Sequence, residues 1–398
     1  MPRWRDRLVR NSPAGWQTRC MTDLVTERTR AGAGRPVTTL PKAHLHLHFT
    51  GSMRPRTLLD LADKHRIRLP ESLREHHLPP LTPDERGWFR FQRLYDAARN
   101  CVRDADDMRR IVLEAAADDA AEGSRWLEMQ VDPTSYAPYV GGLIPALEIV
   151  LDAAREATAT TGCQVAVIVA ASRIRHPLDA RTLARLAARY SGDGPGQVIG
   201  FGLSNDERRG ATEEFAAAFR IAARAGLMSA PHSGELLGPE HVWTTLSYLH
   251  PQRLGHGVRS GEDRELLSRL VDQGIALEVC PSSNVALGVY ETLADVPLRD
   301  LVTAGARVAL GADDPLLFGA RLAAQYEAAR QAQNFDDNGL ADLARSSIGA
   351  SVAPESVKRD LLAGVDAWLA APEPPEPVGV PGQSSQPSNT GSGTSVTP

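Results

Sequence analysis

The sequence predicts an α/β fold of the (β/α)8 or TIM-barrel class, because β-forming and helical segments alternate along most of its 398 residues. Short runs of β-forming residues recur, and each is followed by an Ala-, Leu- and Arg-rich stretch with apolar residues at helical spacing. This alternation is typical of βα units that build a parallel sheet. The eight candidate strands lie at 43–48, 126–131, 164–170, 198–203, 227–232, 253–256, 275–280 and 307–310. Eight parallel strands predict closure into a barrel.

The segments outside this repeat define the expected domain organisation. The gap between the first and second candidate strands is the longest, and apolar positions at helical spacing around Leu58 and Phe91 predict an inserted helical cap over the barrel mouth. Residues 37–371 are expected to form the barrel. Residues 1–36 are expected to be a loose extension, and the Pro-, Ser-, Gly- and Thr-rich residues 372–398 a disordered tail.

Composition excludes several classes of function. With 44 basic and 49 acidic residues the net charge is −5, which argues against a nucleic-acid partner. The longest apolar run, 165–171, is far shorter than the roughly 20 residues of a membrane span. The Arg-rich first 20 residues lack the apolar stretch of a secretory signal, and the 4 scattered cysteines suit reduced thiols. We therefore expect a cytoplasmic protein whose partner is a small molecule; the sequence makes no prediction of oligomeric state.

The first candidate strand carries three histidines at alternate positions, His44, His46 and His48, which place their side chains on one face. Alternate residues of a strand lie about 6.5 Å apart, so His44 and His48 are about 13 Å apart and cannot bind one ion. His46 and His48 lie nearer the carboxyl end of the strand, where barrels carry their catalytic groups. A single strand histidine is more often a hydrogen-bonded core residue, but this pair predicts a metal site, with His44 as a packing or supporting residue.

Other strand ends supply further polar residues. His232 and Glu235 follow the fifth candidate strand, His256 lies between two glycines at the end of the sixth, and Asp313 and Asp314 follow the eighth. In isolation the two aspartates are better interpreted as a solvated turn, and the Gly-His-Gly segment is weak evidence. Together the residues indicate one site, because the register of a barrel brings its strand ends together.

Three imidazoles and one carboxylate, from His46, His48, His232 and Asp313, form a nitrogen-rich ligand set that suits one Zn²⁺ ion per chain with a position left for water. Iron or cobalt are alternatives. A zinc ion lowers the pKa of its water toward neutrality and so supplies a nucleophile. His256 could accept the proton of that water, and Glu235 could act as an acid if it is protonated.

These segments resemble the adenosine deaminase family of the metal-dependent amidohydrolases, across residues 40–369. The family's opening motif, Pro-Lys-Ala-Glu-Leu-His-x-His-Leu-Asp-Gly, is similar to residues 41–51, and its His-Ala-Gly-Glu is similar to residues 232–235. Three further motifs occur in the family's order, at 255–257, 280–284 and 313–316.

The resemblance implies roles for the site residues. It implies zinc on His46, His48, His232 and Asp313. His256 would assist the attacking water, Glu235 would donate a proton to the purine N1, and Asp314 would contact N7. Attack at C6 followed by loss of ammonia would leave the 6-oxo purine, and no organic cofactor is required.

Two departures from the family pattern lie near the sugar. Where the family has an Asp that holds the ribose 5′-hydroxyl, this chain has Thr50, a shorter and neutral group. Asn205 replaces the glycine whose backbone faces the purine N3. A site without the 5′-hydroxyl partner suits a nucleoside whose 5′ end carries another group. We therefore expect aminodeoxyfutalosine, an intermediate of menaquinone biosynthesis, as the substrate, with adenosine, in purine salvage, as the alternative.

Other interpretations remain open at this stage. A non-catalytic nucleoside-binding barrel normally lacks a ligand or acid position, whereas none is missing here. A deaminase of adenine base or of nucleotides is a further alternative. A binuclear hydrolase commonly needs a bridging lysine on the fourth strand, and no lysine occurs in residues 198–207, which favours a single metal.

Overall fold

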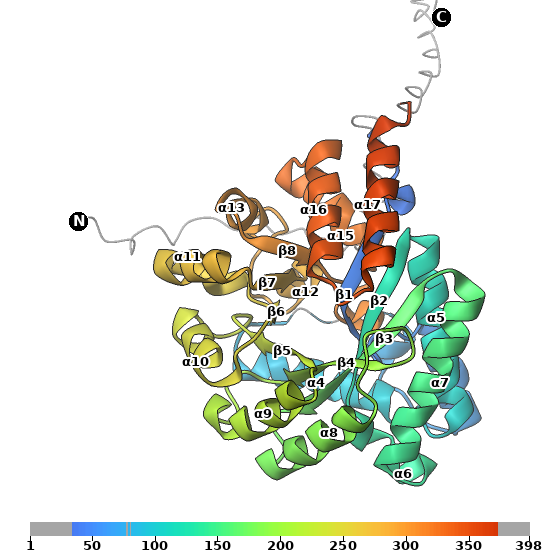
Figure 1. The fold of residues 1–398 in the computed structure, drawn as a ribbon. Coiled ribbons are helices and arrows are strands. Elements are labelled where there is room, and N and C mark those ends of the chain that lie inside the picture. Colours follow the sequence, from blue (N-terminus) through green and yellow to red (C-terminus); the bar gives the residue numbers. More distant parts are fainter. Residues whose placement is uncertain (1–33, 77–78, 80, 373–398) are drawn as a thin grey trace, which may run out of the picture.

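The computed structural model describes residues 34–76, 79 and 81–372, and it contains one parallel sheet of eight strands in the order of the sequence (Figure 1). The strands are β1 (Lys42–His48), β2 (Ser124–Val131), β3 (Gln164–Ser172), β4 (Val198–Ser204), β5 (Met228–Ser233), β6 (Arg253–His256), β7 (Ala276–Val279) and β8 (Arg307–Leu310). Each corresponds to a predicted strand. The predicted (β/α)8 barrel is confirmed.

The barrel closes between its last strand and its first. Asp313, just beyond β8, donates its backbone N–H to the carbonyl of His46 over 3.1 Å, and the N–H of His48 donates to the carbonyl of Asp313 over 3.0 Å. The same backbone contact that closes the barrel therefore brings Asp313 beside the two histidines of β1.

Strand β3 shows why these segments fold as parallel strands. Residues 165–171 of the strand are apolar without interruption, and alternate side chains enter two different cores. Val165, Val167 and Val169 pack with the surrounding helices, whereas Ala166 and Ile168 belong to the other core. A strand that is buried on both faces is typical of parallel sheets covered by helices.

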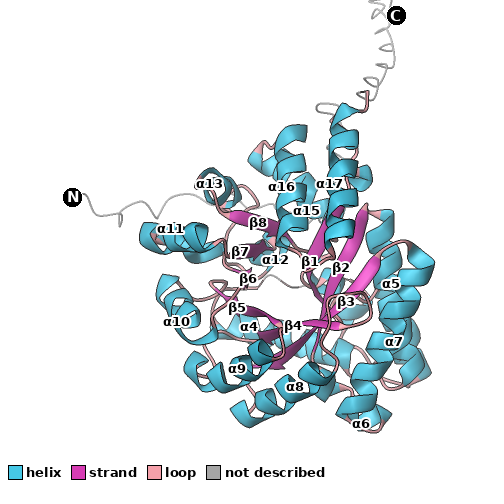
Figure 2. Cartoon of the chain, in the orientation of Figure 1, coloured by secondary structure: helices cyan, strands magenta, loops and turns pink. Residues whose placement is uncertain are grey.

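Helices surround the sheet (Figure 2). Four occupy the long segment between β1 and β2: α2 (Pro55–Lys64), α3 (Glu71–Arg74), α4 (Glu85–Arg99) and α5 (Ala105–Ala121). Side-chain caps mark the starts of α4 and α5, since Asp84 accepts the N–H of Gly87 over 2.9 Å and Asp104 forms a reciprocal capping box with Asp107.

The remaining helices follow the later strands. Those between strands are α6 (Ala137–Val140), α7 (Leu143–Thr161), α8 (Pro177–Arg189), α9 (Ala216–Arg224), α10 (Pro239–Leu249), α11 (Arg264–Gln273), α12 (Pro281–Ala286) and α13 (Leu298–Thr303). After β8 come α14 (Pro315–Phe318), α15 (Leu322–Gln333), α16 (Asp337–Ala350) and α17 (Glu355–Ala370). The α16 helix packs against β8 and β1 and so covers the junction where the barrel closes.

Most of the expected N-terminal extension and C-terminal tail, residues 1–33 and 373–398, lies outside the described residues, as does Cys20. Cys101, Cys163 and Cys280 are buried free thiols. In the described part of the chain, no helix combines the length and the apolar composition needed to cross a membrane.

Candidate metal and catalytic site

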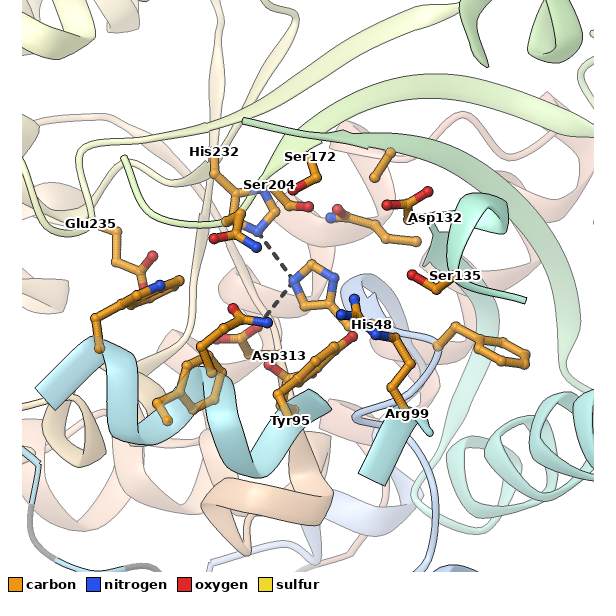
Figure 3. A pocket seen from close by; sticks show the side chains of 18 of the residues that line it. His48, Tyr95, Arg99, Asp132, Ser135, Ser172, Ser204, His232, Glu235 and Asp313 are labelled. Atoms are coloured by element: carbon orange, nitrogen blue, oxygen red, sulfur yellow. Dashed lines mark hydrogen bonds and ion pairs between the residues drawn. The ribbon is translucent and has the colours of Figure 1, made fainter. Parts of the chain in front are cut away.

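The four predicted metal ligands converge at the carboxyl ends of β1, β5 and β8. Nε2 of His48 lies 3.1 Å from Nε2 of His232 and 3.2 Å from Oδ1 of Asp313. Nε2 of His46 lies 3.6 Å from the same Asp313 oxygen. Nitrogens of the three histidines all lie within 4.8 Å of one another. Figure 3 shows the dashed contacts from His48 to His232 and Asp313.

This arrangement fits a metal ion with a further position for water. Ligand atoms about 2.0–2.2 Å from Zn²⁺ lie about 2.8–3.8 Å from one another at angles of about 90–120°, a range that includes the spacing of these side chains. Among the described residues, the buried Nε2 of His46 has no hydrogen-bond partner. A buried polar atom without a partner is costly, and a cation at this point would supply one.

Nearby carboxylates favour positive charge at the same place. Burial lowers the pKa of His46, but the nearby carboxylates of Asp313 and Glu278 outweigh it and raise the pKa to about 10. Glu278 Oε2 lies 2.7 Å from Nδ1 of His46, and its other oxygen pairs with Arg253 Nε at 2.7 Å. Glu278 therefore fixes the ring of His46 and leaves Nε2 directed at the other ligands.

His232 has the opposite electrostatic environment, which suits it as a neutral ligand. Burial, followed by the charges of His46, His48 and His256, holds the pKa of His232 well below its usual value. Its backbone carbonyl accepts a hydrogen bond from the buried guanidinium of Arg173 over 2.8 Å. The end of β5 is thus anchored by a buried cation.

His44, the first of the three histidines of β1, contacts the segment that carries a proposed ligand. Its Nδ1 lies 2.8 Å from Asp119 Oδ2, and its Nε2 accepts the backbone N–H of Ala312 over 3.1 Å. Ala312 directly precedes Asp313, so His44 helps to hold the segment that carries this carboxylate.

Glu235 has an environment that favours the protonated carboxyl. Burial, then the charges of Asp313 and Glu207, raises the pKa of Glu235 well above its usual range. Its loop is held by Glu207, whose Oε2 accepts the N–H groups of Glu235, Leu236 and Leu237 at 3.2, 2.6 and 2.8 Å. Glu235 Oε2 lies 3.5 Å from His256 Nε2.

His256 and Asp314 complete the group. Burial lowers the pKa of His256 to about 3, so the ring is neutral, and its Nε2 lies 3.9 Å from Asp313 Oδ2. Burial and the charge of Asp313 raise the pKa of Asp314 well above its usual range, which favours the protonated form. His256 and Asp313 have φ values of 62° and 60°, a sparsely populated conformation that concentrates at functional sites.

Two glycines make room for these side chains. A Cβ on Gly255 would lie 3.0 Å from both His232 Nδ1 and His46 Cε1, which agrees with the close approach predicted for the Gly-His-Gly segment. A Cβ on Gly51 would collide with the carboxyl of Asp314. Gly51 therefore requires glycine, and a side chain at Gly255 would crowd the two histidine rings.

The two predicted substrate contacts near the sugar differ in placement. Asn205 lines the pocket, with φ of 82° at a position where glycine is the easiest residue to accommodate. Thr50 is buried, and its hydroxyl lies 2.5 Å from the Tyr136 hydroxyl. Tyr136 lines the pocket and Thr50 does not, so Thr50 reaches the pocket only through Tyr136.

Several pocket residues were missed by the sequence analysis. Helix α4 contributes Trp88, Phe91, Gln92, Tyr95 and Arg99, and the segment after β2 contributes Asp132, Ser135 and Tyr136. Asp132 could have been found from the sequence, because it directly follows a predicted strand, as the other site residues do. Nothing in the sequence distinguishes Arg99 from the many other arginines.

Comparisons with known proteins place the chain in a family. The model of the family described as adenosine deaminase matches residues 41–368. A Streptomyces coelicolor protein with the provisional name adenosine/adenine deaminase is 63% identical over 342 residues, which cover 85% of this chain and 99% of that protein. The chain belongs to the adenosine deaminase family. It is a hydrolase of the adenosine/adenine deaminase type, which confirms the resemblance of the motifs.

Other members of the adenosine deaminase family are more distant. Aminodeoxyfutalosine deaminase of Streptomyces avermitilis is 32% identical over 338 residues, 83% of this chain and 92% of that protein. Among solved structures, adenine deaminase of Arthrobacter aurescens matches with a TM-score of 0.76 and 30% identity, over 83% of this chain and 100% of that chain. The relatives of this chain are thus named after three different substrates: adenosine, adenine and aminodeoxyfutalosine.

Proposed function

We propose that this protein catalyses the hydrolytic deamination of an adenine nucleoside at C6, with one Zn²⁺ ion held by His46, His48, His232 and Asp313. The observation that carries the proposal is the convergence of three histidines and Asp313 beside a pocket that Glu235 also lines, where burial raises the pKa of the Glu235 carboxyl. When bound, the metal makes a water molecule nucleophilic at neutral pH by lowering its pKa.

The side chains supply the proton transfers. Glu235, protonated, donates to the purine N1 and makes C6 more electrophilic. Neutral His256 takes the proton of the attacking water, and protonated Asp314 donates a hydrogen bond to N7. Water adds at C6, His256 passes the proton it took from water to the C6 amino group, which leaves as ammonia, and the proton of the added hydroxyl returns to Glu235, which gives the 6-oxo purine. The low-polarity surroundings that raise the pKa values of Glu235 and Asp314 also strengthen these contacts.

Two nucleosides are candidates. Aminodeoxyfutalosine is supported by the 32% identical relative of that name and by Thr50, which lacks the carboxylate that the family directs at a 5′-hydroxyl. Adenosine is supported by the provisional name of the 63% identical relative. A preference for aminodeoxyfutalosine would associate the protein with menaquinone biosynthesis, and a preference for adenosine with purine salvage.

The test is a comparison of kcat/KM for both nucleosides on purified, metal-analysed protein, following ammonia release. We expect about one zinc per chain and turnover of at least one of them. An advantage of more than about tenfold for adenosine would reject aminodeoxyfutalosine as the preferred substrate. Zinc-loaded protein that releases no ammonia from either nucleoside would contradict the proposed reaction and favour a binding role.

A further inference from the structure

The pocket extends beyond the catalytic residues into a second polar region. Its wall includes Asp132 and Ser135 from the segment after β2 and Arg99 from the end of α4. Figure 3 shows these three side chains on one side of His48 and Glu235 on the other. We call Arg99, Asp132 and Ser135 the distal cluster.

Asp132 presents a carboxylate oxygen to the pocket. Its Oδ1 accepts both the N–H and the hydroxyl of Thr134, at 3.0 and 2.5 Å. Within the described part of the chain, no hydrogen bond is formed by Oδ2 or by the hydroxyl of Ser135. Thr134 therefore fixes the orientation of the carboxylate, and its second oxygen remains available to a ligand.

The neighbouring Tyr136 has less to offer a ligand. Its hydroxyl is already paired with Thr50 at 2.5 Å, and the Tyr136 ring packs edge-on against Phe49 with centroids 5.1 Å apart. Tyr136 thus forms a rigid wall beside Asp132. The hydrogen-bonding capacity of this end of the pocket lies in the distal cluster.

The charge of the distal cluster favours a neutral ligand over an anion. Arg99 donates from Nη2 to Asp96, which already compensates the guanidinium. Burial lowers the pKa of Arg99, but Tyr95, Tyr136, Asp96 and Asp132 together raise it above its ordinary value. Asp96 therefore balances the charge of Arg99, and burial raises the pKa of Asp132, so the cluster offers little net positive charge to a phosphate or carboxylate ligand.

We propose that Asp132, Ser135 and Arg99 bind the sugar hydroxyls of the substrate, so that the enzyme selects adenine nucleosides over free adenine. This inference rests on the proposed deamination, and it adds that the site recognises the sugar as well as the base. A carboxylate that accepts from hydroxyl groups, with a hydroxyl and a guanidinium that donate to them, matches the donor and acceptor pattern of a diol. Free adenine would leave these groups without partners.

The test compares adenosine and free adenine as substrates of the wild-type protein and of Asp132→Asn. We expect wild type to prefer adenosine by more than about tenfold in kcat/KM. Asp132→Asn should lower kcat/KM for adenosine about tenfold, mainly through KM, and change that for adenine by less than about twofold. Arg99→Gln should act in the same direction.

Controls separate recognition from structure. Asp152→Asn replaces an exposed carboxylate on α7 and should leave kcat/KM unchanged for both substrates. An equal loss on both substrates in Asp132→Asn would assign Asp132 a structural role and overturn the inference. Wild-type protein that deaminates adenine as fast as adenosine would also overturn it, yet would leave the deamination chemistry intact. Wild-type protein that deaminates no adenine compound would instead contradict the proposed function itself.

Discussion

The two ends of the pocket are both polar but are built differently. The residues around the candidate metal site come from strand ends and are almost fully buried, with His46 at 0% and Asp313 at 4% exposure. The distal cluster comes from a helix end and a loop, and the side chain of Arg99 is 27% exposed. The strands of the barrel therefore fix the groups that would perform the chemistry. Recognition depends on segments whose position the strands do not determine.

Burial affects titratable groups at both ends of the pocket. At the metal end, burial raises the pKa values of Glu235 and Asp314 and lowers that of His256. At the distal end, burial also raises the pKa of Asp132, and Arg99 is paired with Asp96. Substitutions at the metal end should therefore abolish turnover, whereas substitutions in the distal cluster should change KM for one substrate relative to another.

The largest effect is expected from Glu235→Gln. The amide keeps the shape of the side chain but cannot donate the carboxyl proton, so kcat should fall by about 100- to 10,000-fold. Steady-state assay with the preferred nucleoside measures this, and Glu213→Gln, an exposed position, is the matched control. Turnover within a few-fold of wild type would remove Glu235 from the role of acid.

A smaller effect is expected from Glu278→Gln, which tests metal affinity without replacing a proposed metal ligand. The substitution weakens the 2.7 Å contact to Nδ1 of His46, and loss of such an orienting partner typically lowers metal affinity about 10- to 100-fold. Competition with a chelator, followed by metal analysis, measures affinity independently of activity. Affinity equal to that of wild type would show that Arg253 and Glu278 serve folding only.

The sequence predicted one end of the pocket far better than the other. The carboxyl ends of parallel strands must meet at one face of a barrel, so His46, His232 and Asp313 could be grouped before any coordinates were known. The bounds of β6 and β8 were predicted to the residue. Arg99 could not be predicted, because nothing in the strand register fixes where α4 lies. Glu278 was overlooked although a charged residue inside an apolar strand is itself a signal.

Glu207→Gln should change the pH dependence of the reaction. Glu235 is active while protonated, so activity is present below its raised pKa and is lost as pH rises through it. Burial is the main cause of that shift, and the charge of Glu207 adds to it. Removing this charge lowers the pKa of Glu235, so the alkaline limb of kcat/KM should move to lower pH. The weaker hydrogen bonds to residues 235–237 should also lower kcat/KM about tenfold.

The pH–rate profiles of wild type and Glu207→Gln measure this effect. Glu213→Gln, again as control, should reproduce the wild-type profile. A uniform loss of activity at all pH values, without displacement of the alkaline limb, would show that Glu207 positions the loop but does not influence the proton on Glu235.

The smallest effect is expected at Asn205, which lies on the pocket wall. Its φ of 82° is accessible to glycine and tolerated by asparagine, whose Oδ1 accepts the N–H of Asp206 over 2.8 Å. Asn205→Gly should therefore change the free energy of unfolding by less than about 1 kcal/mol and KM by less than about threefold. Asn205→Val forces a β-branched residue into this conformation and should destabilise by about 1–3 kcal/mol. Denaturant unfolding of both variants measures the difference, and equal stabilities would show that the backbone at 205 relaxes to another conformation.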